Sequence, residues 1–189
     1  MFNVGVDPVQ LGLVASLNQP GGNLTGFNNV AGELGAKGLA LLHELVPGTE
    51  TIGFLENPNN PASELATRDL LAAAPSVGLK VQILKARNDR EIDAAFVSLA
   101  QARTGALLVA NDLFFNNRIE RLIELAAHQA IPTMYAFREF VVAGGLISYG
   151  TNQTETYRQV GLYTGRILKG EKPADLPVTG KMTGHMRSS

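Results

Sequence analysis

Residues 51–74 read TIGFLENPNNPASELATRDLLAAA, and this stretch is the most informative one about the fold. TIGFL (51–55) is apolar on both faces, as are strands of a parallel sheet that is covered on both sides. A corner that contains two prolines and three asparagines follows, ENPNNPAS (56–63). The segment from Pro61 to Val77 then has helical character. A buried strand, a turn and a helix in this order indicate a βαβ unit.

The same rhythm runs through most of the chain and predicts an α/β fold with a doubly wound parallel sheet. Besides 51–55, apolar runs predict strands at 2–6, 24–27, 80–84, 105–110, 131–136 and 145–149. Helical spacing predicts helices at 9–18, 33–46, 61–77, 89–102, 114–129 and 155–169. The region from about 30 to 147 therefore has the pattern of one complete lobe, and its flanks have the pattern of parts of another.

Composition excludes several classes of function. Hydrophobic residues make up 45% of the 189 residues, which predicts a packed core, and 16 basic against 17 acidic residues give a net charge of −1. No basic stripe is present, so a nucleic-acid partner has no electrostatic support. The chain has no cysteine and three scattered histidines, which excludes thiolate sites and argues against a metal centre. We expect no metal and no cofactor.

The chain shows no sign of a membrane span or a signal peptide. No run of about 18 apolar residues occurs, and MFNVGVDPV (1–9) lacks a basic region followed by a long apolar region. The last residues, TGKMTGHMRSS (179–189), are rich in glycine, threonine and serine without apolar periodicity. We expect a disordered tail there.

Candidate ligand-binding residues follow from the predicted sheet, because ligands of open parallel sheets bind at the carboxyl ends of the strands, near a topological switch point. Polar, aromatic and turn-forming residues gather just after the predicted strands. The candidates are Asp7, Asn57, Asn60, Ser63, Asp112, Phe114, Tyr135, Arg138 and Tyr149. Each single corner also has an ordinary interpretation as turn and cap chemistry, with Asp112 simply capping a helix. Several such corners on one rim together favour a site.

Catalytic motifs are missing from the sequence. It contains no G-x-S-x-G, H-E-x-x-H or G-x-x-x-x-G-K-[ST], and no histidine follows a predicted strand. Five aromatic residues are able to wall an apolar ligand, and we expect about two of them to be core instead. They are Phe114, Phe115, Tyr135, Phe137 and Tyr149. We expect no enzymatic activity.

The order and spacing of several motifs resemble one family over residues 4–178. These motifs are D-P-V, P-G-G-N-x-T-G, N-P-x-N-P, Y-x-x-R-E-F-V-x-A-G-G-L-x-S-Y-G and I-L-x-G-x-K-P-x-D-L-P-V. The chain is similar to ABC-transporter substrate-binding proteins of the tryptophan/tyrosine type, which resemble type I periplasmic binding proteins. The resemblance implies two α/β lobes that close on a small ligand, such as an amino acid, and deliver it to a membrane permease. It also implies an extracytoplasmic location.

Carried onto this chain, the resemblance implies four parts. Residues 1–27 form part of lobe one (strand, helix and first crossing), 28–147 form a complete lobe two, 148–178 form the return crossing and a lobe-one helix, and 179–189 form the tail. Much of lobe one is then missing, as expected of a fragment. We expect its open faces at 2–6, 9–18 and 155–169 to be buried in a homodimer.

If the chain is a solute-binding protein, the positions of the candidates at strand ends suggest roles for some of them. Asp7 would hold an α-amino group, the helix starts at Ser63 and Phe114 would hold a carboxylate, and Phe114 or Tyr135 would stack on a ring. Two other hypotheses remain open at this point: a small-molecule-binding regulatory domain, and an α/β enzyme of flavodoxin-like type. Fold alone does not decide among the three, whereas the motif string favours the binding protein.

Overall fold

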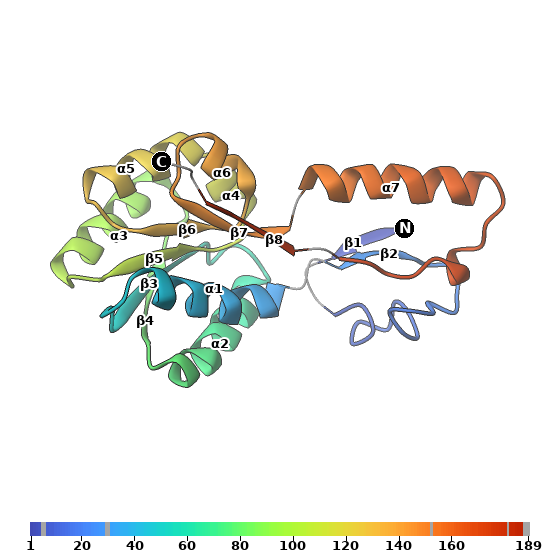
Figure 1. Cartoon of the computed structure of the whole chain (residues 1–189), viewed down its shortest axis with the longest axis horizontal. Coiled ribbons are helices and arrows are strands. Elements are labelled where there is room, and N and C mark those ends of the chain that lie inside the picture. The colour runs from blue at the N-terminus through green and yellow to red at the C-terminus, as the bar shows by residue number, and fades with distance from the viewer. Residues whose placement is uncertain (5–6, 29–30, 152, 181, 187–189) are drawn as a thin grey trace. The chain divides into compact units, whose positions relative to one another are not determined.

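The computed structural model describes residues 1–4, 7–28, 31–151, 153–180 and 182–186 (Figure 1). The chain divides into two compact units. Unit 1 comprises Met1–Ala31 and Thr151–Thr183, and unit 2 comprises Gly32–Gly150 and Gly184–Ser189. Each unit is described by itself below.

A parallel sheet forms the centre of unit 2. Its strands are β3 (Thr51–Glu56), β4 (Lys80–Lys85), β5 (Ala106–Val109), β6 (Thr133–Tyr135) and β7 (Ile147–Thr151). The strand order is β4-β3-β5-β6-β7-β8, with β8 (Met182–Met186) at the edge. The chain thus moves outward from β3 to β4, and then in the opposite direction from β5 to β7. This reversal places a topological switch point between β3 and β5.

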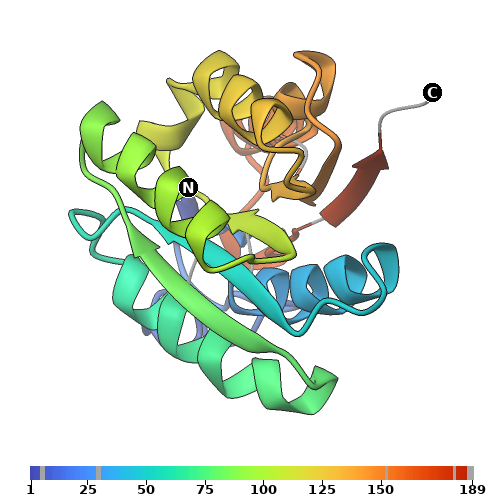
Figure 2. The same cartoon turned by 90° about the vertical axis from the view of Figure 1, so that its left-hand side faces the viewer.

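Helices cover both faces of this sheet, so the predicted α/β doubly wound fold is confirmed (Figure 2). One face carries α1 (Ala31–Leu45), α2 (Ser63–Ala73) and the 3₁₀ turn η1 (Ala74–Val77). The other carries α3 (Asp89–Gln101), α4 (Leu113–Asn116), α5 (Ile119–His128) and α6 (Arg138–Val142).

The alternation of side chains along each strand explains why two cores form. Ile52 and Phe54 point to the face of α1 and α2, whereas Leu55 joins the core beneath α3 and α5. In β5 the side chain of Leu108 belongs to the first core and that of Leu107 to the second. Because both faces are apolar, these strands appear in the sequence as continuous hydrophobic runs.

Unit 1 is built around a short parallel pair, β1 (Phe2–Val4) and β2 (Gly26–Asn28), together with α7 (Gln153–Leu168) and the 3₁₀ turn η2 (Pro173–Asp175). The rings of Phe27 and Tyr163 lie 5.4 Å apart and pack with the fully buried Leu176. The buried Thr25 hydroxyl donates to the Leu176 carbonyl at 2.6 Å. These contacts join β2 and the residue before it to α7 and the segment that follows α7.

Two glycines of the motif string are explained by close backbone approaches. A β-carbon on Gly26 would collide with the carbonyl oxygen of Phe2, on the neighbouring strand. A β-carbon on Gly150 would collide with the carbonyl oxygen of Ala136. Any larger residue at either position would push two backbone segments apart.

Several predicted elements differ from the structure. Residues 9–18 form turns rather than a helix, because Gly12 adopts φ +68° and Ala15 bonds to the carbonyl of Pro20. The helix predicted at 114–129 is interrupted between α4 and α5, where Asn117 and Arg118 leave helical geometry. Helix α6 was not predicted. Strand β8 lies within 179–189, where we expected a disordered tail.

Candidate functional site

The carboxyl ends of β3 and β5 lie side by side at the switch point. Leu55 is paired with Val109 in the sheet register, so the residues after both strands emerge at the same edge. Asn57 follows β3, and Asp112 follows β5. The Asn57 side-chain amide donates to Asp112 Oδ1 at 3.1 Å. The structure therefore brings together two candidates that are 55 residues apart in the sequence.

Asp112 is the centre of this cluster. Its side chain caps α4, where Oδ1 accepts the backbone N–H of Phe114 at 2.7 Å. Its other oxygen, Oδ2, accepts the side-chain amide of Asn60 at 2.7 Å. Asp112 is only 7% exposed. The structure thus supports both interpretations of Asp112, as a helix cap and as a member of a polar cluster at the rim.

The two asparagine side chains are held at both ends. Asn57 Oδ1 accepts the backbone N–H of Asn59 at 3.0 Å, and Asn60 Oδ1 accepts the backbone N–H of Ala62 at 2.9 Å. Their amide groups face Asp112. These bonds fix the ENPNNPAS corner, and they also fix which way each amide points. We name this set of three side chains, Asn57, Asn60 and Asp112, the rim cluster.

Ser63 belongs to a separate network that the sequence did not reveal. Its hydroxyl donates to Glu56 Oε2 at 2.7 Å, and the hydroxyl of Thr67 donates to the same oxygen. Lys85 Nζ lies 3.7 Å from Glu56 Oε1. Glu56 is 4% exposed at the end of β3. In this structure, Ser63 thus connects the first turn of α2 to the end of β3 by a hydrogen bond.

The aromatic candidates are less accessible than predicted. Tyr135 is 1% exposed and stacks on Phe140 with ring centroids 4.3 Å apart, so it is a core residue in this structure. Burial raises the pKa of the Tyr135 hydroxyl well above its usual range. Phe114 is half-buried, and the Arg118 guanidinium covers one face of its ring at 3.9 Å. Three of the five aromatic residues, Phe115, Tyr135 and Phe137, are buried, against the two expected.

The remaining three candidates lie on other elements of the chain. Tyr149 is half-buried on β7 and packs against the core beneath α1. Arg138 is exposed at the start of α6. Asp7 belongs to unit 1, where its Oδ1 accepts the backbone N–H of Val9 at 2.9 Å and forms a local turn.

An exposed leucine beside the rim cluster also escaped prediction. Leu113, between Asp112 and Phe114, is 73% exposed. No sequence signal distinguishes it, because a leucine in the first turn of a helix ordinarily faces the core. Helix α4 has only four residues, and this leaves Leu113 pointing away from the apolar interior. It offers an apolar surface next to a buried carboxylate.

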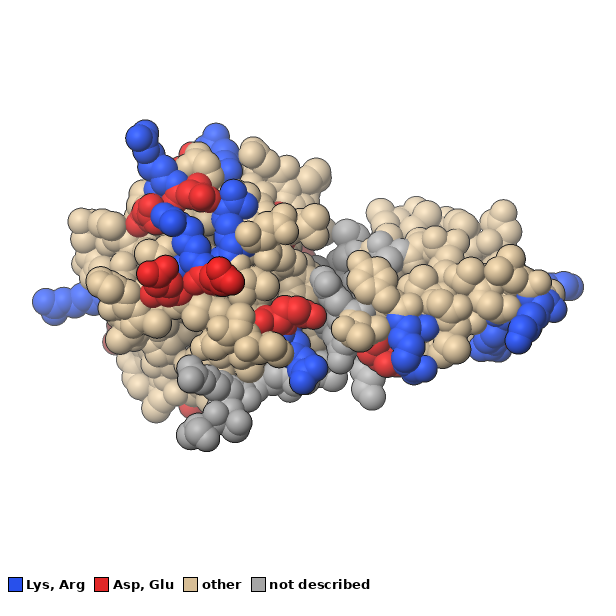
Figure 3. Space-filling view, turned by 90° about the horizontal axis from the view of Figure 1, so that it is seen from above, with Lys and Arg blue, Asp and Glu red and all other residues tan. Residues whose placement is uncertain are grey.

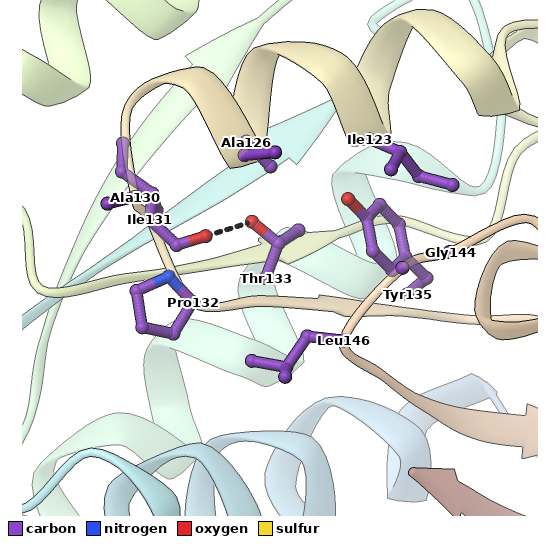
Figure 4. A pocket seen from close by; sticks show the side chains of 11 residues that line it. Ile123, Ala126, Ala130, Ile131, Pro132, Thr133, Tyr135, Gly144 and Leu146 are labelled. Carbon is purple, nitrogen blue, oxygen red and sulfur yellow. Dashed lines mark hydrogen bonds between the residues drawn. The ribbon is translucent and has the colours of Figure 1, made fainter. Parts of the chain in front are cut away.

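An apolar hollow of about 280 Å³ lies over β6, between α5 and the loop that precedes β7 (Figure 4). Ala126, Ile131, Thr133 and Leu146 contribute to its lining. The helix in the crossover from β6 to β7 is α6, and its five residues are too few to cover the strand. None of its lining residues belongs to the rim cluster, so the two features are distinct.

Ion pairs link the outer surfaces of α3 and the α4–α5 segment. Arg118 pairs with Asp89 at 2.5 Å, and Arg121 pairs with Asp93 at 2.6 Å. The Arg118 hydrogen bond lowers the pKa of the exposed Asp89 carboxyl below its usual range. On this side of the molecule acidic and basic side chains are interspersed (Figure 3). That mixture favours solubility over attraction of a strongly charged partner.

Comparison with known sequences assigns the family. The profile of ABC transporter substrate binding proteins matches residues 1–186. The chain belongs to this family of substrate-binding proteins. The resemblance carried by the motif string is thereby confirmed.

One curated relative matches most of the length of this substrate-binding protein. A tyrosine-binding protein of Clostridioides difficile is 27% identical over 173 residues, which are 92% of this chain and 49% of the relative. The chain thus spans about half the length of the curated relative it matches.

In the part of the chain that the structure describes, no helix is long and apolar enough to cross a membrane.

Solved structures agree with this assignment. A Streptococcus pneumoniae ABC domain in complex with L-Trp is 28% identical, with a TM-score of 0.71, over 94% of this chain and 62% of that one. A substrate-binding protein with adhesive properties from Clostridium difficile, in its ligand-free, open form, is also 28% identical, with a TM-score of 0.69, over 93% of this chain and 60% of that one. A LacI-family regulator at 13% identity and a TM-score of 0.65 shares the fold alone.

Proposed function

We propose that this chain forms part of the solute-binding component of an ABC import system, which binds an amino acid with an aromatic side chain and delivers it to a membrane permease. In this proposal unit 2 is one complete lobe and unit 1 is part of the other, and the ligand is held between two lobes. The protein acts outside the cytoplasm and binds its ligand without catalysis.

The rim cluster is the observation that carries the proposal. It lies at the switch point between β3 and β5, where open parallel sheets present their ligand sites. It offers one carboxylate and two amides whose orientations are fixed. The exposed Leu113 beside it provides apolar contact for a ring. A carboxylate, two amides and an apolar side chain in one place suit a small ligand that has both polar and apolar parts, as an amino acid has.

The named relatives support the ligand class. One matched relative is described as tyrosine-binding, and one matched structure contains L-Trp. The alternative of a regulatory domain has only a fold likeness in its favour. A flavodoxin-like enzyme would need a phosphate loop or an acid–base pair, and no observation here favours one.

Calorimetric titration of the chain with L-tyrosine and L-tryptophan tests the proposal. A parallel titration uses this chain joined to the part of the tyrosine-binding relative that the chain does not match. We expect saturable binding to the extended protein that is weaker or lost in this chain alone, because half of the contacts are then missing. Absence of binding to both proteins would refute the proposed ligand class.

A homodimer remains a prediction for unit 1. Leu168, Tyr157 and Leu162 on α7 are 82%, 65% and 49% exposed. Such apolar side chains on one helix are expected to find a partner surface. A dilution series followed by light scattering checks this. A stable monomer at micromolar concentration would count against the dimer.

A further inference from the structure

The apolar hollow over β6 has no part in the proposed amino-acid site. Its lining comes from the end of α5, from β6 and from the loop that precedes β7 (Figure 4). Pro132 precedes β6 and Leu146 precedes β7, so the hollow extends to the amino ends of these strands. The rim cluster instead follows the carboxyl ends of β3 and β5. A ligand in the hollow would therefore occupy a second site.

Backbone hydrogen bonds fix the walls of this hollow. At the end of α5, the Ile131 N–H donates to the Ala126 carbonyl at 3.0 Å. In the loop before β7, the Gly145 N–H donates to the Phe140 carbonyl at 2.7 Å. A β-carbon on Gly145 would lie 2.9 Å from the Tyr135 ring, so glycine lets this loop pack closely against Tyr135. The hollow is thus formed before any ligand enters, as small-molecule sites usually are.

The size and the charge of the hollow restrict what it holds. An engineered apolar cavity of about 150 Å³ is large enough for benzene, so the 280 Å³ here has room for two fused rings. Among the described residues that line the hollow, none has a charged side chain. A charged group would lose its hydration there without gaining a partner. The hollow therefore suits a neutral molecule and excludes the zwitterion of an amino acid.

Thr133 supplies a polar group on the floor of the hollow. Its side chain is 1% exposed, and its hydroxyl donates to the Ile131 carbonyl at 2.9 Å (Figure 4). A hydroxyl has one proton and two lone pairs, so the Thr133 oxygen acts as an acceptor once its proton is engaged. A single acceptor among apolar walls fixes the orientation of a ligand that carries one N–H or O–H donor.

We propose that this hollow is a second ligand site, which takes a compact, neutral, largely apolar molecule that donates one hydrogen bond to Thr133. Indole has these properties and serves as the probe. Indene has nearly the same shape, with a methylene group in place of the N–H, and serves as the matched hydrocarbon. The inference goes beyond the proposed amino-acid function and does not depend on it.

Indole fluorescence measures the binding directly. The chain contains no tryptophan, so indole can be excited selectively at a wavelength that tyrosine does not absorb. We expect a blue shift that saturates with a dissociation constant of about 0.1–1 mM, as is reasonable for a ligand of this size. Indene should displace indole, but bind about 3- to 10-fold more weakly, because it lacks the donor. L-Tyrosine should not displace indole, because its charged groups cannot enter.

Variants of unit 2 locate the site. Ala126→Leu places a larger side chain in the hollow and should weaken indole and indene by more than about 10-fold. Ala94→Leu, at an exposed position of α3, is the matched control and should change neither affinity. Leu113→Ser beside the rim cluster should also change neither.

Thr133→Val tests the acceptor, because valine keeps the branched shape and removes the hydroxyl. Indole affinity should fall by about 3- to 10-fold, whereas indene affinity changes less than about twofold. Circular dichroism and thermal unfolding check that each variant folds.

The results separate the proposal from its alternatives. Unsaturable indole fluorescence, or indole affinity that Ala126→Leu leaves unchanged while the variant is folded, would overturn the site. Loss of indole binding in Leu113→Ser, or displacement by L-tyrosine, would place indole at the rim and overturn the site as well. Equal affinities for indole and indene would overturn the role of Thr133. Loss in Ala126→Leu together with loss of the indole preference in Thr133→Val supports the proposal.

Discussion

Removing the Glu56 carboxylate should destabilise unit 2 through its hydroxyl partners and not through its ion pair. Glu56 ends β3 with its side chain 6% exposed, and it accepts hydrogen bonds from Ser63 and Thr67 of α2. Lys85 lies 3.7 Å away, but its side chain is 61% exposed. The carboxylate therefore connects α2 to the sheet, whereas its pairing with Lys85 is largely screened by water.

The magnitudes follow from these contacts. In Glu56→Ala the Ser63 hydroxyl is left buried without an acceptor, and two hydrogen bonds to a charged group are lost. The free energy of unfolding should therefore fall by about 3 kcal/mol. Thr67 is half-buried and regains a partner from water. Lys85→Gln removes only the screened ion pair and should lower the free energy of unfolding by less than about 1 kcal/mol. Glu56→Gln, which keeps an acceptor oxygen, should fall between the two.

Urea unfolding monitored by far-ultraviolet circular dichroism measures these differences. A chain with two compact units need not unfold in a single step, so amide exchange in the first turns of α2 provides a local readout. Exchange there should accelerate in Glu56→Ala and stay unchanged in Lys85→Gln. A Lys85→Gln penalty as large as that of Glu56→Ala would refute the reasoning, because the ion pair would then dominate.

Three further predictions concern other parts of the molecule. Arg118→Gln should raise the pKa of Asp89 back toward its usual range in a carboxyl NMR titration. Because that pKa is held low in the folded chain, its contribution to stability is present above the unfolded pKa and is lost as pH falls through the folded value. The Tyr135 hydroxyl should not ionise at its ordinary pH. In an alkaline titration, the ultraviolet absorbance of ionised Tyr135 is the difference between the titration curves of the original chain and of Tyr135→Phe. This absorbance should appear only as alkali unfolds the chain. The raised pKa in the folded state contributes stability that is lost as pH rises. Gly26→Ala should destabilise unit 1 by about 1–3 kcal/mol and expose Phe2 in β1 to faster amide exchange, since no room exists for a β-carbon.

Much of the fold could be predicted because it depends on periodicity. The five strands from β3 to β7 overlap the strands that the sequence predicted, and α3 was expected almost to its ends. The errors came from single residues that change local geometry. Gly12 with positive φ turns 9–18 away from a helix, and Asn117 and Arg118 interrupt 114–129. Neither effect alters hydrophobic spacing, so a pattern of spacing does not reveal it.

The site was predictable only in part, for a related reason. The rule about strand ends located Asn57, Asn60 and Asp112 correctly as neighbours, because topology fixes which loops meet. Accessibility does not follow from strand ends. Tyr135 is the last residue of β6, yet its ring turns inward onto Phe140, whereas Leu113 faces outward from a helix of four residues. Side-chain direction at the end of an element depends on how the chain continues, and three-dimensional packing decides that.

The structural and the binding interpretations of the ENPNNPAS corner are compatible, and the hydrogen bonds explain why. As turn residues, Asn57 and Asn60 each use one amide oxygen to hold the backbone of the corner. That same bond orients the amide nitrogen toward Asp112, so the energy that folds the loop also fixes the buried carboxylate in place. A rigid acceptor loses little conformational entropy when a ligand binds. Two of the three asparagines in this corner therefore act twice, since each holds the turn and orients the buried carboxylate of the candidate site.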